Sequence, residues 1–367
     1  MLFLLCVPFS NFTYIFGNFS LLEAVIVAYL LFAIFCSKSP FFISRFQLFG
    51  LFLILLMLFL IISLFGLRVD YLVYFTQLLF AVILLPLFSS HLCRRISIET
   101  LLKSCLIIAV CTSVVLILSP YIANPLVRFD GRARYFPNTT GSTATFLIAF
   151  SYVAFLFSKH KINIIAFAFL TVVLVSGVLM ISQRSTLLGF VLVLSMIFLK
   201  GRTAGLIAIL LLSAFIVLGV GMSFLEGARV SEDFLEDASR LTIISDLITS
   251  ISLEPENVLY GWGPGNWESS IASQKPHNNF LHLMIDYGVI IAVYFSIAVF
   301  GFAFYFLLPK ECSNRKLYFF LFLATIPYYA THTYTLERGK LIFFVMMSCF
   351  FVSDLRDAKQ HSERGLN

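Results

Sequence analysis

The chain contains few charged residues for its length. Of its 367 residues, 12% are charged and 60% are hydrophobic, and the mean hydropathy is +0.97. Soluble domains carry roughly 25% charged residues, about twice the fraction found here. Apolar runs such as Leu48–Phe65 are too long and too frequent for the core of a soluble domain. The composition therefore predicts an all-α polytopic membrane protein.

Several motifs that carry common chemistries are also missing. The sequence has no P-loop, no G-x-S-x-G elbow and no Cys/His pair with zinc spacing. The acidic run SEDFLED could attract a divalent cation, but it also fits the solvated face of a loop helix. We favour the solvated face and expect no metal site and no cofactor. None of the seven Cys lies in the longest polar loop, so no structural disulfide is expected there.

Apolar runs of membrane-spanning length recur along the chain. An α-helix needs about 20 apolar residues to cross the hydrocarbon layer, and short or tilted helices widen this range. The sequence predicts about 12 transmembrane helices, at 2–16, 21–36, 48–65, 71–88, 101–118, 141–157, 162–181, 185–199, 204–224, 282–307, 317–334 and 340–352. No predicted span carries an acid deep in its core, since Glu23 and Asp286 lie near ends. This disfavours a proton- or sodium-coupled transporter.

The distribution of charge predicts the orientation of these spans. With both termini in the cytoplasm, the inner connections hold 15 of the 25 basic residues and five of the 19 acids. The outer segments then hold ten basic and 14 acidic residues. This arrangement follows the positive-inside rule, and the opposite orientation violates it.

The predicted topology divides the chain into six parts. These are N-terminal membrane helices (1–118), a first outer loop (119–140), central membrane helices (141–225), a large outer loop between helices 9 and 10 (226–281), C-terminal membrane helices (282–352) and a cytoplasmic tail (353–367). Within the large loop, Ser231–Ser250 is predicted to form a short amphipathic helix. The sequence GWGPGNW that follows is typical of a turn, and its two Trp suit a loop that dips into the membrane interface.

Arginine is over-represented on the outer face, with eight Arg to two Lys against seven Arg to eight Lys inside. Arg never deprotonates and binds phosphate oxygens two at a time, so this bias favours an anionic ligand such as a phosphate-bearing lipid. Pairing with the outer acids or with lipid headgroups is the alternative for each Arg. Arg184 is the strongest candidate because it lies between two apolar runs with no acid within forty residues. An interfacial anchor is the other reading of Arg184.

His277 is the candidate proton acceptor, because it lies where the large outer loop returns to the membrane. Histidine exchanges a proton near neutral pH and is the most frequent general base. His282, five residues later, would point about 140° away from it on a helix. A helix cap or an interfacial residue is the alternative role for His277.

Four segments in order resemble one protein family. They are ISQRSTLLGF, DASRLTIISDLI, VLYGWGPGNW and PHNNFLHLMIDYG, and the last ends the large outer loop. Together they resemble the bacterial O-antigen ligase and O-antigen polymerase superfamily over roughly 135–350. His277, Asn278 and Gly288 fit the spacing of the family's histidine motif, whereas Ile291 departs from the Gly, Thr or Tyr often found there.

The resemblance implies an activity and a set of site residues. Members of the family move a glycan from undecaprenyl pyrophosphate to an acceptor sugar hydroxyl on the periplasmic face of the bacterial inner membrane. By matching position, Arg184 and Arg240 would hold the pyrophosphate and His277 would take the hydroxyl proton. Substrate-binding roles would fall to Asn278 and, more weakly, to Arg338, Arg128, Arg132 and Arg134. The reaction would invert the anomeric centre without a metal.

Four functions remain open at this point. A ligase transfers the polymer to lipid A–core, whereas a polymerase transfers it to another lipid-linked repeat, and both use the same donor chemistry. We favour the ligase, because the single large loop and the histidine motif resemble ligases most. A lipid-linked glycan transporter is a remoter alternative, as is a purely structural assembly partner. Expected partners are the lipid-linked donor, the acceptor and membrane lipid, with no nucleic acid.

Overall fold

The structure is a computed structural model that describes part of the chain. The residues described are 14–16, 19–20, 24, 26–31, 45–67, 69–84, 87–88, 98–122, 139–180, 184–198, 246–247, 249–264, 279–307 and 315–331. The principal helices are α3 (Arg45–Phe65), α4 (Val69–Leu79), α6 (Ile98–Ile122), α7 (Thr139–Ser158), α8 (Ile164–Met180), α9 (Arg184–Phe198), α15 (Asn279–Leu307) and α16 (Arg315–Thr331). A π-helical turn, η1 (Phe80–Leu84), extends α4, and the short α13 (Asn257–Tyr260) precedes α15.

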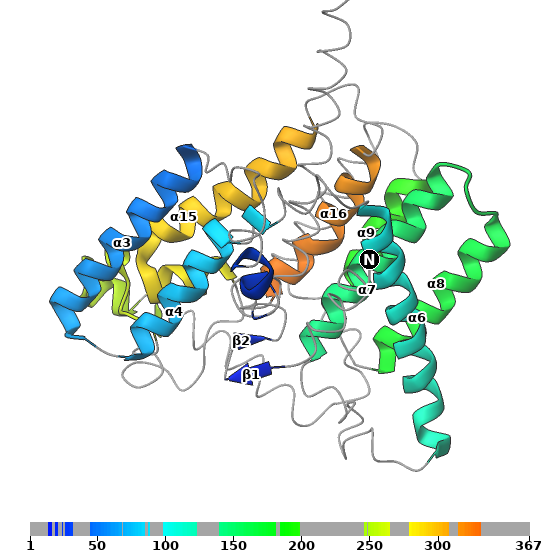
Figure 1. Cartoon of the computed structure of the whole chain (residues 1–367), viewed down its shortest axis with the longest axis horizontal. Coiled ribbons are helices and arrows are strands. Elements are labelled where there is room, and N and C mark those ends of the chain that lie inside the picture. Colours follow the sequence, from blue (N-terminus) through cyan, green and yellow to red (C-terminus); the bar gives the residue numbers. More distant parts are fainter. Residues whose placement is uncertain are drawn as a thin grey trace, which may run out of the picture.

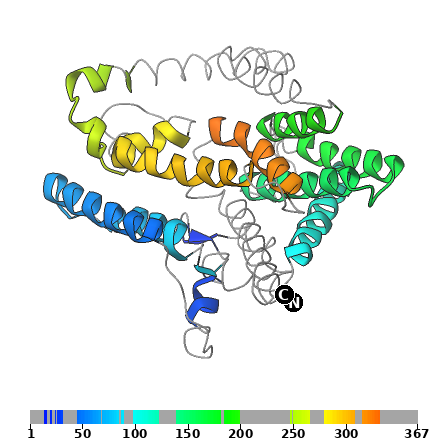
Figure 2. The same ribbon diagram turned by 90° about the horizontal axis from the view of Figure 1, so that it is seen from above.

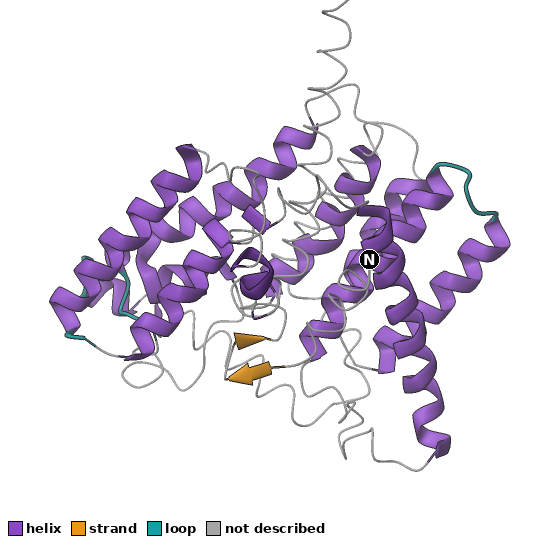
Figure 3. Ribbon diagram, viewed as in Figure 1, coloured by secondary structure: helices purple, strands orange, loops and turns teal. Residues whose placement is uncertain are grey.

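The predicted all-α class is confirmed, with one small exception (Figure 3). Strands β1 (Tyr14–Phe16) and β2 (Phe19–Ser20) form an antiparallel pair in which Tyr14 faces Ser20. The prediction of a helix over 2–16 is therefore wrong for its last three residues. Its apolar aromatic sequence does not distinguish a short strand from the end of a helix. The rest of that predicted span lies outside the described residues.

The helices form two groups joined by α16. Figures 1 and 2 show α3, α4 and α15 on one side of the molecule and α6 to α9 on the other. Helix α16 packs against α7 and α9 in one group and against α15 in the other. The described helices coincide with the predicted spans 48–65, 141–157, 162–181, 185–199, 282–307 and 317–334, within a few residues at each end. Helix α6 runs to Ile122, four residues into the predicted first outer loop.

Helix α7 lies at the centre of its group. Every residue from Thr143 to Phe155 is buried, and α7 packs against α6, α8, α9 and α16. Phe150 stacks on Phe190 of α9 with ring centroids 4.0 Å apart. The buried hydroxyl of Ser151 donates to the Leu147 carbonyl at 2.8 Å, which satisfies it within the helix. A helix that is apolar all round, as this one is, must be buried on every side.

Small residues allow two close helix contacts in this group. A Cβ at Gly177 of α8 would lie 2.2 Å from the Ser113 hydroxyl oxygen of α6. A Cβ at Gly189 of α9 would lie 2.4 Å from the backbone oxygen of Ala324 in α16. Glycine at these positions lets the helix axes approach more closely than any larger residue allows. The Gly189 contact therefore sets the position of α9 against α16.

The connection between α7 and α8 has specific end signals. The N–H groups of His160 and Lys161 donate to the carbonyls of Phe157 and Leu156, both at 2.9 Å, as in a Schellman motif. His160 takes the left-handed conformation, with φ 56°, that glycine usually occupies there. The Asn163 side chain then accepts from the Ala166 N–H at 2.8 Å and caps α8. These signals turn the chain back within a few residues.

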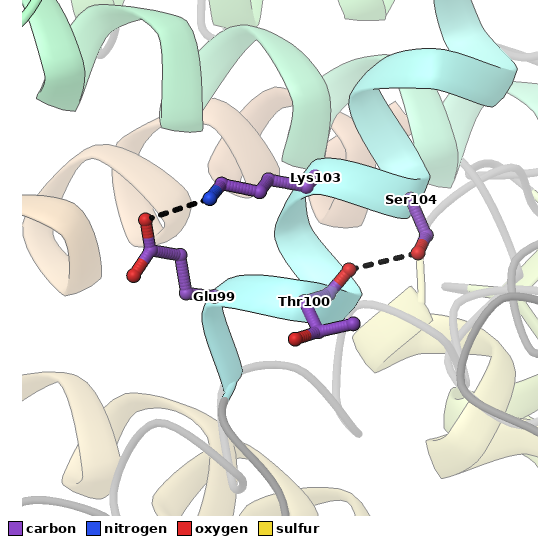
Figure 4. Close-up of polar contacts among 4 residues, drawn as sticks. All are labelled: Glu99, Thr100, Lys103 and Ser104. Atoms are coloured by element: carbon purple, nitrogen blue, oxygen red, sulfur yellow. Dashed lines mark hydrogen bonds and ion pairs between the residues drawn. The ribbon is translucent and has the colours of Figure 1, made fainter. Parts of the chain in front are cut away.

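Helix α6 begins in a polar first turn, shown in Figure 4. Lys103 Nζ lies 3.2 Å from Glu99 Oε1, and both side chains are more than half exposed. The Ser104 hydroxyl donates to the Thr100 carbonyl at 2.8 Å. Glu99 in the first turn also matches the positive end of the helix dipole. The polar turn gives way to an apolar helix directly after Ser104.

Within the described residues, one helix is long and apolar enough to cross a membrane by length and composition. It is Glu99–Leu118 in α6, with a mean hydropathy of 2.5. The shorter apolar helices in the same part of the chain are Leu48–Leu64, Thr143–Ser158, Ile164–Leu179, Thr186–Ile197 and Phe280–Tyr294.

Candidate functional site

The structure describes the backbone of one predicted site residue. Arg184 is the first residue of α9. The others lie outside the described residues, namely His277, Asn278, Arg240, Arg338, Arg128, Arg132 and Arg134. Their convergence around one anion stays a prediction.

The first turn of α9 contains an unused hydroxyl. Thr186 is fully buried, and its Oγ1 has no hydrogen-bond partner among the described residues. A buried hydroxyl without a partner costs free energy, and most buried polar groups have one. The start of α9 therefore has hydrogen-bonding capacity left for a group outside the described residues.

Helix α15 begins two residues after His277 and contains the rest of the histidine motif from Asn279 onward. The helix is broken at the glycine that ends the motif. Its first residue, Asn279, comes after His277 and Asn278 in the chain. Gly288, the glycine of the same motif, has φ 84° and ψ 165°. Essentially only glycine occupies this backbone region. The motif thus ends at a break between two halves of α15, 279–287 and 289–307.

A compact turn from the large outer loop lies against this break. Residues 249–253 are helical, and α13 follows after Pro255. The Gly261 N–H donates to the Asn257 carbonyl at 2.7 Å and ends α13. Gly261 has φ 81° and ψ 174°, the same glycine-only conformation as Gly288. Figure 2 shows the yellow-green segment that contains α13 beside α15.

The two glycines meet backbone to backbone. A Cβ at Gly261 would lie 2.7 Å from the backbone nitrogen atoms of Gly288 and Tyr287. A Cβ at Gly288 would lie 2.0 Å from the Leu259 carbonyl oxygen and 2.7 Å from the Tyr260 Cα. These neighbours are backbone atoms, which cannot swing aside as a flexible side chain does. Neither position accepts a side chain without moving the turn away from α15.

A hydrogen bond from the turn compensates for the break. The Trp262 N–H donates to the Ile285 carbonyl at 2.7 Å. In an unbroken helix this carbonyl would accept from Val289, four residues later, and Gly288 lies between the two. Trp262 therefore acts as an external cap for the first half of α15. We call the contacts among Gly261, Trp262, Ile285 and Gly288 the glycine latch.

The Trp262 side chain is held by a carboxylate. Its indole Nε1 donates to Glu254 Oε2 at 3.0 Å, and the Asn257 amide donates to the same oxygen. Trp262 is buried, at 5% exposed, in the same hydrophobic core as Tyr287. The indole of Trp262 thus packs inside the protein, and the expectation that both Trp suit a loop at the membrane interface stays a prediction. Trp267 lies outside the described residues.

Carboxylates also affect the residue before the latch. The pKa of Tyr260 is raised from its ordinary value, first by partial burial and then by the negative charges of Glu256 and Glu254. Each of these causes disfavours a phenolate. Tyr260 therefore stays neutral near the latch at any physiological pH.

A buried polar pair lies in the first half of α15. His282 Nε2 is 3.3 Å from Asp286 Oδ2, one helical turn away, and the two side chains are 6% and 2% exposed. Tyr287 packs edge-to-face on Phe75 of α4, with ring centroids 5.3 Å apart. The first half of α15 is thus held against the rest of the protein by the latch and by α4.

Sequence reasoning missed the latch and the His282–Asp286 pair. The sequence shows the spacing of His282 and Asp286 but not their burial, and on a helix His282 points about 140° away from His277. The GWGPGNW turn was predicted, and its contact with Gly288 was not. Gly261 lies in a turn-forming loop segment and Gly288 in an apolar segment, and nothing in the sequence indicates that these two glycines are in contact.

The chain matches no protein-family model, no curated protein and no solved structure in comparisons with known proteins.

Proposed function

We propose that the chain is a polytopic inner-membrane glycosyltransferase that works on the periplasmic face. It transfers a glycan from undecaprenyl pyrophosphate to an acceptor sugar hydroxyl, and O-antigen ligase is the form we favour. His277 accepts the hydroxyl proton, while Arg184 and Arg240 stabilise the leaving pyrophosphate. Fixed positive charge near a leaving phosphate accelerates transfer because it binds the transition state more tightly than the ground state.

Exposed apolar faces support the membrane location. On α3, Leu48, Phe49, Phe52, Leu55, Leu56 and Phe59 are exposed along one helical face. The opposite face, with Leu53, Ile54, Met57 and Ile61, is buried. On α6, Ile107, Val114, Val115 and Leu118 form a similar exposed stripe. Water-soluble proteins rarely expose contiguous apolar patches of this extent, whereas lipid tails favour them.

The observation that carries the enzymatic proposal is the glycine latch. VLYGWGPGNW and PHNNFLHLMIDYG are two of the segments on which the family resemblance rests, and they are separated in the chain. They meet at Gly288, the glycine of the histidine motif, which takes a conformation essentially restricted to glycine. Gly288 therefore has a glycine-only conformation and a backbone contact with a second segment of the resemblance. An ordinary apolar helix needs neither feature, so both support a specific role for the motif.

A deletion strain tests the function directly. Without the gene, a ligase predicts loss of polymer on lipid A while lipid-linked polymer accumulates. A polymerase predicts surface glycan of one repeat only, and a transporter predicts lipid-linked glycan held on the cytoplasmic side. Unchanged surface glycan would overturn the proposal.

Point variants test the residue roles. Restoring the gene with His277→Ala or Arg184→Ala, at wild-type levels in the membrane, is expected to leave the deletion phenotype in place. Transfer at near wild-type rates by both variants would refute the assignment of these two residues.

A further inference from the structure

The direction of the first half of α15 is not fixed by α15 itself. A continuous helix holds its axis by its own hydrogen bonds, and this one is interrupted at Gly288. The halves contact different helices, since Tyr287 packs on Phe75 of α4 and Tyr294 packs on Phe49 of α3. The Gly261–Trp262 turn fills the break, so it helps to set the angle between the halves, together with their packing on α4 and α3.

We propose that Gly261, Trp262 and Gly288 are positioning residues for glycan transfer. The half-helix that they hold begins at Asn279, immediately after His277 and Asn278. Its direction therefore determines where the chain delivers the proposed base. This inference rests on the proposed function and adds to it a group of residues that touch neither donor nor acceptor.

A positioning role has a recognisable kinetic effect. Displacing a reacting group by about 1 Å can cost about 100-fold in rate, even when substrate binding is unchanged. Loosening the latch should therefore lower kcat about 100-fold while KM for the lipid-linked donor changes less than about threefold. A purely structural loss would lower the amount of folded protein and leave kcat of the remaining molecules unchanged.

Two glycines provide a matched pair of variants. Gly288→Ala adds a Cβ against the Leu259 carbonyl and also strains a positive φ. Gly66→Ala, after α3, strains a similar φ of +77° but has no atom within 4 Å of the new Cβ. Gly66→Ala therefore controls for a positive φ without a backbone contact. Gly261→Ala, whose shortest contacts are 2.7 Å, replaces Gly288→Ala if the latter does not insert.

The opening of the latch can be measured without any substrate. Because the chain has only two Trp, the Trp267→Phe protein reports Trp262 alone. In this full-length background, Gly288→Ala should red-shift Trp262 emission and increase its quenching by acrylamide. Hydrogen exchange of the 279–287 amides should become at least tenfold faster. Gly66→Ala should match the parent in both measurements.

Transfer is then measured in proteoliposomes that contain lipid-linked glycan extracted from the deletion strain as donor and lipid A–core as acceptor. Exposure of Trp262 together with the expected fall in kcat at unchanged KM supports the positioning role. Exposure of Trp262 with unchanged kcat overturns it, as does unchanged exchange of 279–287. Wild-type protein that transfers no glycan in these vesicles would instead overturn the proposed function and this role with it.

Discussion

The imidazole of His282 and the carboxylate of Asp286 lie side by side inside the first half of α15, one helical turn apart, with 3.3 Å between Nε2 and Oδ2. Both side chains are almost fully buried. A buried carboxylate is stable only with a charged or hydrogen-bonding partner close by. The pair lies between the start of α15 and the latch at Gly288, within the segment that carries the histidine motif into the helix.

We expect Asp286→Leu to destabilise the protein strongly, because it leaves a buried imidazole without its carboxylate. Removing one partner of a buried pair costs about 3–5 kcal/mol, whereas replacing both is often close to neutral. The double variant His282→Leu/Asp286→Leu should therefore be more stable than either single variant. Thermal unfolding of the purified proteins in detergent gives the double-mutant cycle. Additive losses would show that the two side chains do not stabilise each other.

Trp262 should be sensitive to a single carboxylate. Glu254→Gln removes the charge that accepts from both the indole and the Asn257 amide, and we expect it to lower stability by about 1 kcal/mol. The Trp262 fluorescence in the Trp267→Phe background should also change. Glu256→Gln removes a neighbouring exposed charge and serves as the control. Equal effects of the two substitutions would assign the change to general electrostatics rather than to the hydrogen bonds.

The sequence predicted the helical elements well because their apolar runs are long. Spans such as 141–157 and 185–199 differ from α7 and α9 by one or two residues at each end. Hydrophobic length is a local property, so it needs no knowledge of neighbouring helices. The helix prediction failed at Tyr14–Phe16, because three apolar residues are too few to show a helical or a strand period.

Tertiary contacts were not predictable in the same way. The break at Gly288 depends on Leu259 and Trp262, which are distant in the chain. The burial of Trp262 depends on the same contact, whereas interfacial Trp is the usual expectation for a membrane loop. The candidate site was predicted from residue types, such as outer-face Arg and a histidine motif, and of these residues the structure describes only the backbone of Arg184.

The close approach of α9 and α16 predicts a cost for any side chain at Gly189. Gly189→Leu would force the helices apart, since a Cβ alone would lie 2.4 Å from the Ala324 carbonyl oxygen. Overpacking of this kind costs about 1–3 kcal/mol. Because α9 begins at Arg184, glycan transfer should fall as well. Leu188→Ala, at the partly buried neighbouring position, is the control for a simple volume change. Wild-type stability of Gly189→Leu would contradict the close packing.

Arg184 gives the sharpest test of the proposed chemistry. Lysine keeps the positive charge but lacks the planar fork that binds two phosphate oxygens. We expect Arg184→Ala to lower the rate of transfer about 100- to 1000-fold, the cost of removing one transition-state donor. Arg184→Lys should reduce the rate of transfer less than Arg184→Ala does, by about tenfold. Rates are measured in proteoliposomes that contain the extracted lipid-linked donor and lipid A–core as acceptor.

Arg315→Ala provides the matched control, because Arg315 also begins a helix but lies on the predicted cytoplasmic side. Its transfer rate should equal that of the wild type. If Arg184→Lys and Arg184→Ala lose the same activity, the role of Arg184 is geometric and not one of charge. If neither loses activity, the guanidinium does not contact the pyrophosphate, and the leaving group must be stabilised by other outer-face arginines.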